Sequence, residues 1–230
     1  MNLLSIVIPV FNERASVCRV VDRVRASEVR GLAKEIIVVD DGSTDGTREV
    51  LKAQVGKTAD LRLLFHERNR GKGAALHTGI AETHGEIVLV QDADFEYDPA
   101  EYAKLVQPIR DGAADVVYGS RFLGDSLKDT LRSRHRLQNK ALTVLSNLST
   151  GLRLTDMETC YKVFSGDLIR SLRIEEQRFG FEPEITAKIA KLNARILEVR
   201  ISYRGRSRME GKKITWKDGV SALRCIVKYR

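Results

Sequence analysis

The sequence predicts an α/β fold, a mainly parallel β-sheet flanked by helices, formed by a single domain that spans residues 1–230. In the first half of the chain, short apolar runs alternate with longer amphipathic stretches, which is the pattern of βαβ units. No internal repeat, low-complexity tract or long linker divides the sequence. A hydrophobic content of 43% is enough for a packed core and excludes a disordered chain.

The expected strands are too short for helices, and several are rich in Val and Ile, as strands buried on both faces are. They are the runs Ile6–Phe11, Ile36–Val39, Leu61–Phe65, Ile87–Val90 and Val116–Tyr118. The stretches between them are spaced like crossover helices and run over Ser16–Val29, Thr44–Val55, Gly73–Thr83 and Pro99–Ile109. Pro99 suits the first turn of its helix, and Asp98 is the expected N-cap.

The second half of the chain has a different pattern. A polar and basic stretch, Gly124–Lys140, predicts a loop, and alternation over Ile196–Tyr203 predicts a strand. Helical spacing predicts two helices between them. The residues that mark these helices are Leu142, Leu145 and Leu148, and then Ile185, Ile189 and Leu192.

The C-terminal segment predicts a basic amphipathic helix from Trp216 to Arg230. One face carries Trp216, Val220, Leu223 and Val227, and the other sides carry Lys217, Arg224 and Lys228. Two interpretations remain open: the apolar face packs onto the core, or it lies on a membrane surface. In the second case Arg132, Arg134, Arg136 and Lys140 would add to the attraction to anionic lipid.

The composition favours anionic partners and an intracellular protein. The formal net charge is +8, from 39 Lys and Arg against 31 Asp and Glu. Cys18, Cys160 and Cys225 are odd in number and widely separated, which fits neither a disulfide framework nor a zinc site. The N-terminus lacks the pattern of a signal peptide, and no apolar run approaches the ~20 residues that span a bilayer. We therefore expect a cytoplasmic protein whose membrane contact, if any, is peripheral at the inner face of the cell membrane.

Three carboxylates follow the fourth expected strand at two-residue intervals. They are Asp92, Asp94 and Glu96. Ligands of open α/β sheets collect at the carboxyl ends of strands, and divalent cations such as Mg²⁺ take oxygen ligands that they share with substrate phosphates. These three residues are therefore candidate metal ligands. A solvated turn is the alternative for a motif this short.

A second acidic cluster, Asp40–Thr47, follows the second expected strand and opens a helix. Asp41 could accept hydrogen bonds from a base or ribose, whereas helix capping would explain the cluster without a ligand. Asn12 and Glu13 follow the first strand in the same way. Three polar strand ends should therefore meet at one edge of the sheet.

Basic residues are expected around this edge. They are Arg68, Arg70, Lys72, Arg121, Arg206, Lys212 and Lys213. The Gly71-Lys72-Gly73 turn has only a superficial likeness to a phosphate loop, since it lacks the full Walker spacing. Arg121 follows the last strand of the first half and could grip a phosphate with two hydrogen bonds. A solvated surface charge is the alternative for each of these residues.

The ordered motifs of the chain resemble family 2 glycosyltransferases of GT-A fold, and among them the dolichyl-phosphate and polyprenyl-phosphate hexose (mannose or glucose) synthases. The motifs are Ile8-Pro9-Val10-Phe11-Asn12-Glu13, Val39–Thr47, Gly71-Lys72-Gly73, Asp92-Ala93-Asp94 and Gly119-Ser120-Arg121. Two later segments, Thr155–Phe164 and Phe179-Gly180-Phe181-Glu182, extend the resemblance over most of the chain. It implies a Rossmann-like sheet with a nucleotide-sugar-binding half, residues 1–125, and an acceptor-binding half, residues 126–230.

The resemblance also implies roles for particular residues. Those that would bind the nucleotide sugar are Pro9, Phe11, Glu13, Asp41, Asp92, Ala93, Arg206 and Lys212. Asp92, Asp94 and Glu96 would hold Mg²⁺ or Mn²⁺, although comparable enzymes often have Gln where this chain has Glu96. Arg121, Arg206 and Lys212 would face the diphosphate or the acceptor phosphate. The expected catalytic residues are Asp94, Arg121, Asp156 and Glu158.

The implied reaction is an inverting transfer of a hexose from a GDP-mannose or UDP-glucose type donor to a polyprenyl or dolichyl phosphate. The alternative is a soluble or saccharide hydroxyl acceptor, for which Asp156 or Glu158 would serve as the base. A surface turn before the strand-like Tyr161–Phe164 is the other interpretation of these two residues. A basic nucleic-acid-binding module and a nucleotidyltransferase are further alternatives, but we find no nucleic-acid-binding signature and expect no such partner.

Overall fold

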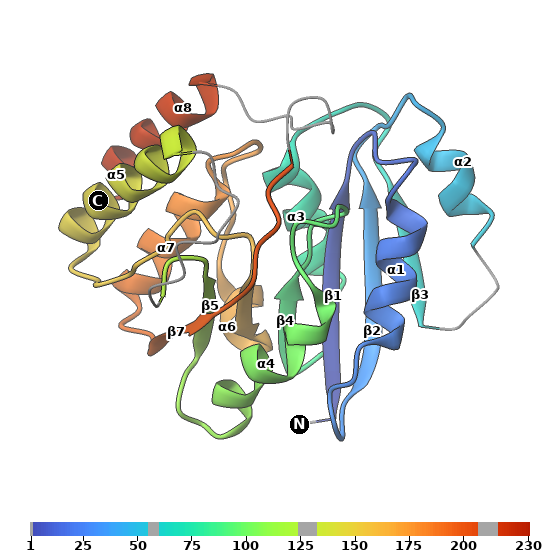
Figure 1. Cartoon of the computed structure of the whole chain (residues 1–230), viewed down its shortest axis with the longest axis horizontal. Coiled ribbons are helices and arrows are strands. Elements are labelled where there is room, and N and C mark those ends of the chain that lie inside the picture. The colour runs from blue at the N-terminus through green and yellow to red at the C-terminus, as the bar shows by residue number, and fades with distance from the viewer. Residues whose placement is uncertain (1, 55–59, 124–132, 207–215) are drawn as a thin grey trace.

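The computed structural model describes residues 2–54, 60–123, 133–206 and 216–230. Within these residues the chain forms one seven-stranded sheet in the order β3-β2-β1-β4-β6-β5-β7, with helices on both faces (Figure 1). The strands are β1 Leu3–Val10, β2 Ala33–Asp40, β3 Leu61–Phe65, β4 Ile87–Val90, β5 Val116–Ser120, β6 Lys162–Ser165 and β7 Ile196–Arg200.

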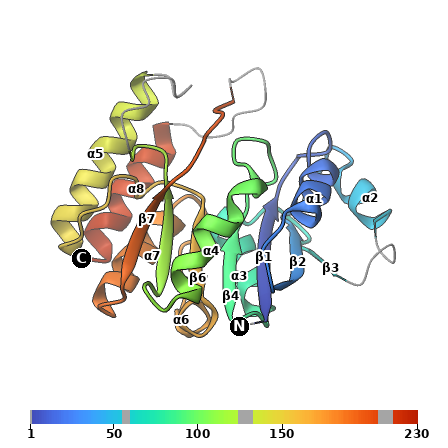
Figure 2. The same ribbon diagram turned by 60° about the horizontal axis from the view of Figure 1, so that its bottom comes forward.

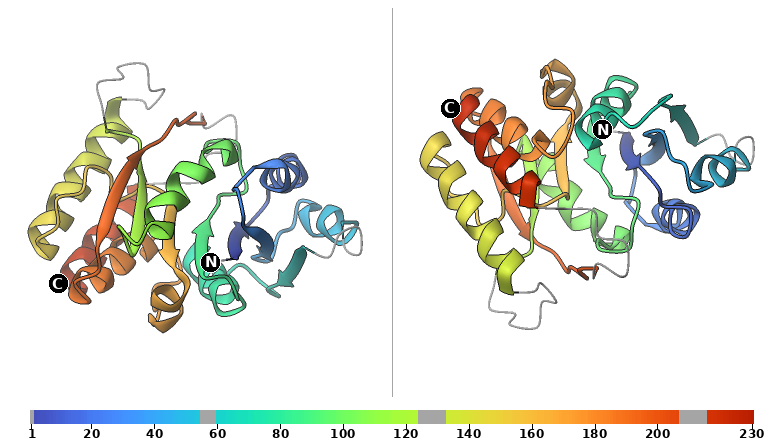
Figure 3. Two further views of the ribbon diagram at one scale, coloured as in Figure 1. Left: turned by 90° about the horizontal axis from the view of Figure 1, so that it is seen from below. Right: turned by 90° about the horizontal axis from the view of Figure 1, so that it is seen from above.

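The helices cover the sheet in layers. They are α1 Val17–Ala26, α2 Thr47–Lys52, α3 Lys72–Ala81, α4 Tyr102–Arg110, α5 Ser133–Thr150, α6 Gly166–Ser171, α7 Phe181–Lys191 and α8 Trp216–Lys228, with a 3₁₀ turn, η1, at Pro99–Glu101. Helices α1 and α4 lie on one face of the sheet, and α3, α6 and α7 lie on the other (Figure 3). Helices α5 and α8 lie side by side near the β7 edge of the sheet (Figures 2 and 3).

The strand order reverses at β1, and this positions the site. β1 pairs in parallel with β2 on one side and with β4 on the other, and β2 pairs in parallel with β3. The carboxyl ends of β1, β2 and β4 therefore lie at one edge of the sheet, where open α/β sheets bind their ligands. β6 runs antiparallel between β4 and β5, and β7 is parallel to β5.

Helix α1 illustrates how the sequence pattern selects the buried faces. Val17, Val20, Val21 and Val24 recur at helical spacing and are all buried. The central strands are apolar on both faces, and the four residues of β4 are all buried. Burial of a Val side chain contributes roughly 1.5–3 kcal/mol relative to exposure, so this face holds α1 onto the sheet.

Most of the expected elements are confirmed, and one is wrong in part. All five expected strands of the first half are present, and Asp98 caps η1 by accepting a hydrogen bond from the Ala100 N–H at 3.0 Å. Residues 133–140, however, belong to α5 and not to a loop. Within residues 136–140, Lys140 is exposed and Arg136 is half-buried, so the polar composition is compatible with a helix at the surface. The remainder of the expected loop, residues 124–132, lies outside the described residues.

Candidate active site

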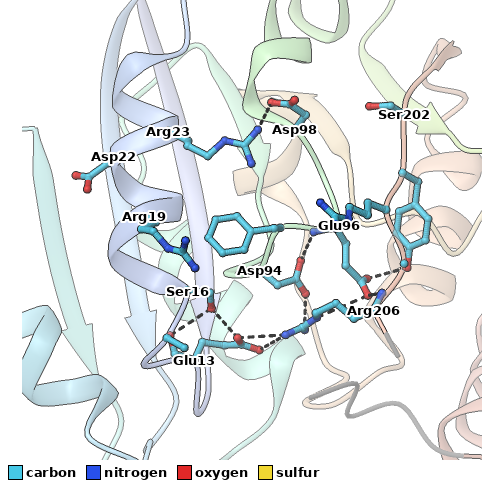
Figure 4. Close-up of a pocket in the computed structure, with 15 residues that line it drawn as sticks. Glu13, Ser16, Arg19, Asp22, Arg23, Asp94, Glu96, Asp98, Ser202 and Arg206 are labelled. Atoms are coloured by element: carbon cyan, nitrogen blue, oxygen red, sulfur yellow. Dashed lines mark hydrogen bonds and ion pairs between the residues drawn. The ribbon is translucent and has the colours of Figure 1, made fainter. Parts of the chain in front are cut away.

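Polar segments from β1, β2 and β4 meet at one edge of the sheet and surround a pocket of about 280 Å³, here called the inner pocket. The predicted residues that line it are Pro9, Phe11, Glu13, Asp41, Asp92, Ala93, Asp94, Glu96 and Arg206. The expected convergence of three strand ends is therefore confirmed. Glu13, Asp94, Glu96 and Arg206 also border a second hollow of about 990 Å³, here called the outer groove (Figure 4). Lys212 lies outside the described residues.

Asp41 organises one wall of the inner pocket. Its buried carboxylate accepts hydrogen bonds from the backbone N–H groups of Arg70 at 2.9 Å and Gly71 at 2.7 Å, and His66 Nδ1 lies 2.7 Å from it. These contacts tie the end of β2 to the turn before α3. The role predicted for Asp41, binding a nucleoside, would therefore be shared with a structural one.

The Gly71-Lys72-Gly73 turn is not a phosphate loop. The N–H groups of Gly73 and Ala74 donate to the carbonyls of Arg178 at 3.2 Å and Gln177 at 2.9 Å. A Cβ on Gly71 would come within 2.4 Å of the Gln177 carbonyl oxygen, so the glycine permits close backbone contact. The N-terminus of α3 thus binds protein carbonyls in place of an anion.

Asp92 is bound to a lysine. Lys72 Nζ lies 3.1 Å from Asp92 and 3.1 Å from Glu182, and all three side chains are largely buried. Burial disfavours the charge on Lys72, but the anionic neighbours, led by Asp92, outweigh it and raise the lysine pKa. Lys72 thereby links the pocket floor to the start of α7.

Asp94 and Glu96 form ion pairs with Arg206, whereas Asp92 is paired with Lys72. Arg206 Nη2 lies 2.5 Å from Asp94, Nη1 lies 3.1 Å from Glu13, and the Arg206 N–H donates to Glu96 at 2.7 Å (Figure 4). Burial and the charges of Asp92 and Glu96 raise the Asp94 pKa to about 7. No group of three acidic, His or Cys side chains in the described part of the chain is arranged to hold a metal. The predicted set of Asp92, Asp94 and Glu96 is therefore not assembled as one ligand group.

Arg121 forms a buried ion pair with Asp156. Arg121 Nε and Nη2 donate to the two carboxylate oxygens of Asp156, each at 2.7 Å, and the Arg121 N–H adds a third bond at 3.0 Å. The exposed fractions of the two side chains are 6% and 0%. Neither residue lines the inner pocket or the outer groove. The pair cross-links β5 to the segment before β6, and the predicted catalytic roles of both residues find no support in this geometry.

Glu158, like Arg121 and Asp156, lines neither the inner pocket nor the outer groove. Burial and the charge of Glu182 raise its pKa to about 7, and its Oε1 atom is buried with no hydrogen-bond partner among the described residues. Nearby, Lys162 is fully buried and donates to the carbonyls of Met157 and Thr159. Burial lowers the Lys162 pKa to about 8, although the charges of Glu182 and Glu158 act in the opposite direction. Glu158 does not line either hollow, so its catalytic role stays a prediction.

Arg178 and Phe179 are pocket residues that sequence reasoning missed. Both line the inner pocket from the segment before α7. The Phe179–Glu182 motif contributed to the family resemblance, but it follows no strand of the predicted sheet. The rule of strand ends therefore gave no reason to place it at the site.

Comparison with known proteins identifies the family. Residues 5–173 match glycosyl transferase family 2. The chain is 30% identical over 205 residues to the dodecaprenyl-phosphate galacturonate synthase of Rhizobium johnstonii, covering 88% of this chain and 59% of the relative. It is 28% identical over 221 residues to the undecaprenyl-phosphate mannosyltransferase of Micrococcus luteus, covering 92% of this chain and 88% of that protein. The chain thus spans about three fifths of the length of the first relative.

The fold has a solved counterpart. Glucosyl-3-phosphoglycerate synthase from Mycobacterium tuberculosis, in complex with Mn²⁺, UDP and glucosyl-3-phosphoglycerate, superposes with a TM-score of 0.73 at 24% identity. The match covers 99% of this chain and 80% of that one. This likeness confirms the expected GT-A fold. The match to the family model over residues 5–173 shows that the chain belongs to glycosyl transferase family 2.

Proposed function

We propose that this protein transfers a sugar from a nucleotide diphosphate sugar to a polyprenyl phosphate. The observation that carries the proposal is the inner pocket, which places the apolar side chains of Phe11 and Phe179 beside the charged group of Asp94, Glu96 and Arg206. Such a pocket offers an apolar surface to a nucleoside and charged groups to a diphosphate. Relatives named as polyprenyl-phosphate sugar transferases support the acceptor, and membership of this family argues against a nucleic-acid-binding module.

We propose a divalent cation, Mg²⁺ or Mn²⁺, at Asp94 and Glu96, with Glu13 as a third oxygen donor. Arg206 binds these three carboxylates in the structure, so the cation must displace the arginine before they can act as one ligand group. The donor chemistry fits, because burial and the charges of Asp92 and Glu96 raise the Asp94 pKa, and a bound cation would favour the ionised carboxylate. In the free protein Arg206 supplies part of that positive charge. Bound cations of this kind neutralise charge on a departing diphosphate. Asp92, paired with Lys72, would remain as a polar contact for the donor.

The proposed reaction inverts the anomeric carbon. An acceptor phosphate oxygen attacks this carbon opposite the nucleoside diphosphate, a new carbon–oxygen bond forms, and the bond to the diphosphate breaks. A phosphate monoester is largely anionic near neutrality, so the acceptor needs no general base. The charge that develops on the leaving diphosphate must instead be stabilised, and Arg206 is the cationic side chain that borders both hollows.

A lipid acceptor is supported by exposed apolar side chains on two neighbouring helices, here together called the α5–α8 face. It comprises Leu137, Val144, Leu145 and Leu148 of α5 and Val220, Leu223 and Val227 of α8, each at least 41% exposed. These are seven of the ten large hydrophobic side chains that are exposed in the described residues. Scattered exposed hydrophobics are normal, but a concentration on two neighbouring helices indicates a contact surface.

The opposite side of α8 accounts for its attachment to the domain. Ala222, Cys225, Ile226 and Tyr229 are buried, whereas Val220, Leu223 and Val227 remain in solvent. The interpretation in which these three residues pack onto the core is therefore wrong; the Trp216 side chain is not among those described. Within the described residues, no helix has the length and apolar composition to cross a bilayer. We propose peripheral contact of the α5–α8 face with the inner leaflet of the cell membrane.

The test combines transfer and vesicle binding. Purified protein is incubated with Mn²⁺, GDP- or UDP-sugars and either undecaprenyl phosphate or soluble sugar acceptors. The proposal expects labelled sugar in the lipid phosphate alone, and co-sedimentation with anionic vesicles that weakens as salt rises. Transfer only to a soluble hydroxyl acceptor, with no vesicle binding at low salt, would replace the lipid proposal by the alternative one.

A further inference from the structure

Residues 175–180, here called the strap, connect the C-terminal helix with the inner pocket. They precede α7 and contribute Arg178, an exposed cation, and Phe179, a half-buried ring, to the pocket lining. The strap lies between α8 on one side and the start of α3 on the other. The positions of Arg178 and Phe179 therefore depend on how the strap is held.

On the α3 side, the strap is fixed by its backbone. The carbonyls of Gln177 and Arg178 accept the N–H groups at the start of α3. A Cβ on Gly73 would lie 2.0 Å from the Glu176 carbonyl oxygen, so the two backbones are in direct contact. This contact fixes the distance between the strap and α3, and it involves only backbone atoms of the strap.

On the α8 side, the strap is held mainly by the carboxylate of Glu176, and Glu175 adds a longer contact to Lys228 at 3.5 Å. Glu176 accepts hydrogen bonds from Arg224 Nη2 at 2.6 Å, Lys228 Nζ at 3.0 Å and the Tyr229 hydroxyl at 3.1 Å. The Glu176 side chain is 11% exposed, whereas its partners Arg224 and Lys228 are 61% and 43% exposed, so water screens the two ion pairs from the α8 side only. Two donors from α8 and one from Tyr229, the residue directly after it, thus hold one residue of the strap.

Two further contacts fix the ends of the strap. The Glu184 carboxylate of α7 accepts the N–H groups of Glu175 at 2.7 Å and Glu176 at 2.8 Å. At the other end, a Cβ on Gly180 would come within 2.7 Å of the Cys225 sulfur of α8. The segment that carries Arg178 and Phe179 is thus held at both ends, and Glu176 is its charged link to α8.

We propose that Glu176 is a positioning residue for donor binding, which acts by holding the strap on α8 so that Arg178 faces the diphosphate and Phe179 the nucleoside. Glu176 does not itself line the inner pocket. The inference rests on the proposed function, because it takes the inner pocket as the donor site. It makes affinity for the nucleoside diphosphate depend on a helix that belongs to the α5–α8 face.

The experiment compares Glu176→Gln with Glu175→Gln in the full chain. Both remove one carboxylate charge, but Glu175 is 42% exposed, lies 3.5 Å from Lys228 of α8, and makes its shorter ion pair, 3.1 Å, with Lys188 of α7. Binding of UDP and of GDP is measured by calorimetry with Mn²⁺ present, together with donor KM, kcat and the melting temperature. Glu176→Gln should raise Kd and donor KM about fivefold or more with kcat at saturating donor unchanged, and Glu175→Gln should change them less than twofold.

Arg224→Gln provides a second route to the same contact. It should raise Kd less than Glu176→Gln does, because Lys228 and Tyr229 still hold Glu176, and the double variant should bind no more weakly than Glu176→Gln, since the Arg224 contact is already lost in that variant. Folded Glu176→Gln and Arg224→Gln proteins that bind nucleotide like the wild type would overturn the inference. The inference would also be overturned if Glu175→Gln lost as much affinity for nucleotide as Glu176→Gln. A wild-type protein that binds neither UDP nor GDP would overturn the proposed function as well.

Discussion

Replacing Arg206 by Gln should strengthen the binding of Mn²⁺ to the free protein while weakening catalysis. In the free protein the guanidinium of Arg206 occupies the carboxylates that we propose as metal ligands, Asp94 at 2.5 Å and Glu13 at 3.1 Å. A cation that binds there must displace these ion pairs or share their oxygens. Removing the guanidinium removes the competitor.

The size of the effect follows from the burial of the pairs. The side chains of Arg206, Asp94 and Glu13 are 10–21% exposed, so water screens their charges only in part. A hydrogen bond to a charged group contributes about 1.5–3 kcal/mol. Since 1.4 kcal/mol is a factor of ten, the metal should bind Arg206→Gln about 10- to 100-fold more tightly. In turnover the same variant should lose about 10²-fold in kcat/KM, as when one donor to a developing anion is removed.

The assay is a Mn²⁺ titration without nucleotide, followed by electron paramagnetic resonance or calorimetry over a range of pH values. The range is needed because Arg206 lowers the Asp94 pKa, which is about 7 in the wild type, so removal of the arginine raises it further. Arg204→Gln is the matched control, because Arg204 is an exposed arginine that also borders the outer groove. It removes the same charge and should change the Mn²⁺ affinity less than twofold. Equal or weaker binding of Mn²⁺ to Arg206→Gln would refute the view that this arginine and the metal share carboxylates.

Three further predictions concern stability, pH and the α5–α8 face. Asp156→Asn should lower the free energy of unfolding, measured in urea, by about 3–5 kcal/mol, because it leaves Arg121 buried and unpaired. The control Asp115→Asn breaks the more exposed pair with Arg195 and should lower it by less than about 1 kcal/mol. Burial lowers the Lys162 pKa from 10.5 to about 8, so the folded state binds fewer protons than the unfolded state between these values. The stability of the wild type relative to Lys162→Met should therefore rise as pH increases from about 8 towards 10, and a flat difference would contradict this. Val227→Glu should reduce co-sedimentation with anionic vesicles without lowering the melting temperature, and unchanged binding would exclude this residue from the contact.

The first half of the fold could be predicted because its strands are buried on both faces and read as continuous apolar runs. Apolar runs do not encode direction, however, so the antiparallel insertion of β6 between β4 and β5 could not be predicted. Residues 133–140 were misassigned because an exposed helical segment and a loop have similar polar composition.

The position of the site could be predicted, but the partner of each charge could not. The rule of strand ends brings Glu13, Asp41 and Asp94 to one pocket. That Asp94 meets Arg206, from a segment more than a hundred residues later, depends on tertiary packing. The same holds for the buried pair of Arg121 with Asp156. Spacing along the chain carries no signal for such contacts.

The central claim is that sugar passes from a nucleotide diphosphate donor in the inner pocket to a lipid phosphate. Its most direct test follows radiolabelled GDP-mannose and UDP-glucose with undecaprenyl phosphate and Mn²⁺ in anionic vesicles, with Asp94→Asn as the matched inactive variant. We expect one donor to give a lipid-linked sugar of inverted anomeric configuration, and the variant to give at least 10²-fold less. A wild-type protein that transfers neither sugar to the lipid but glycosylates a soluble hydroxyl acceptor, or an Asp94→Asn variant with full activity, would contradict the account.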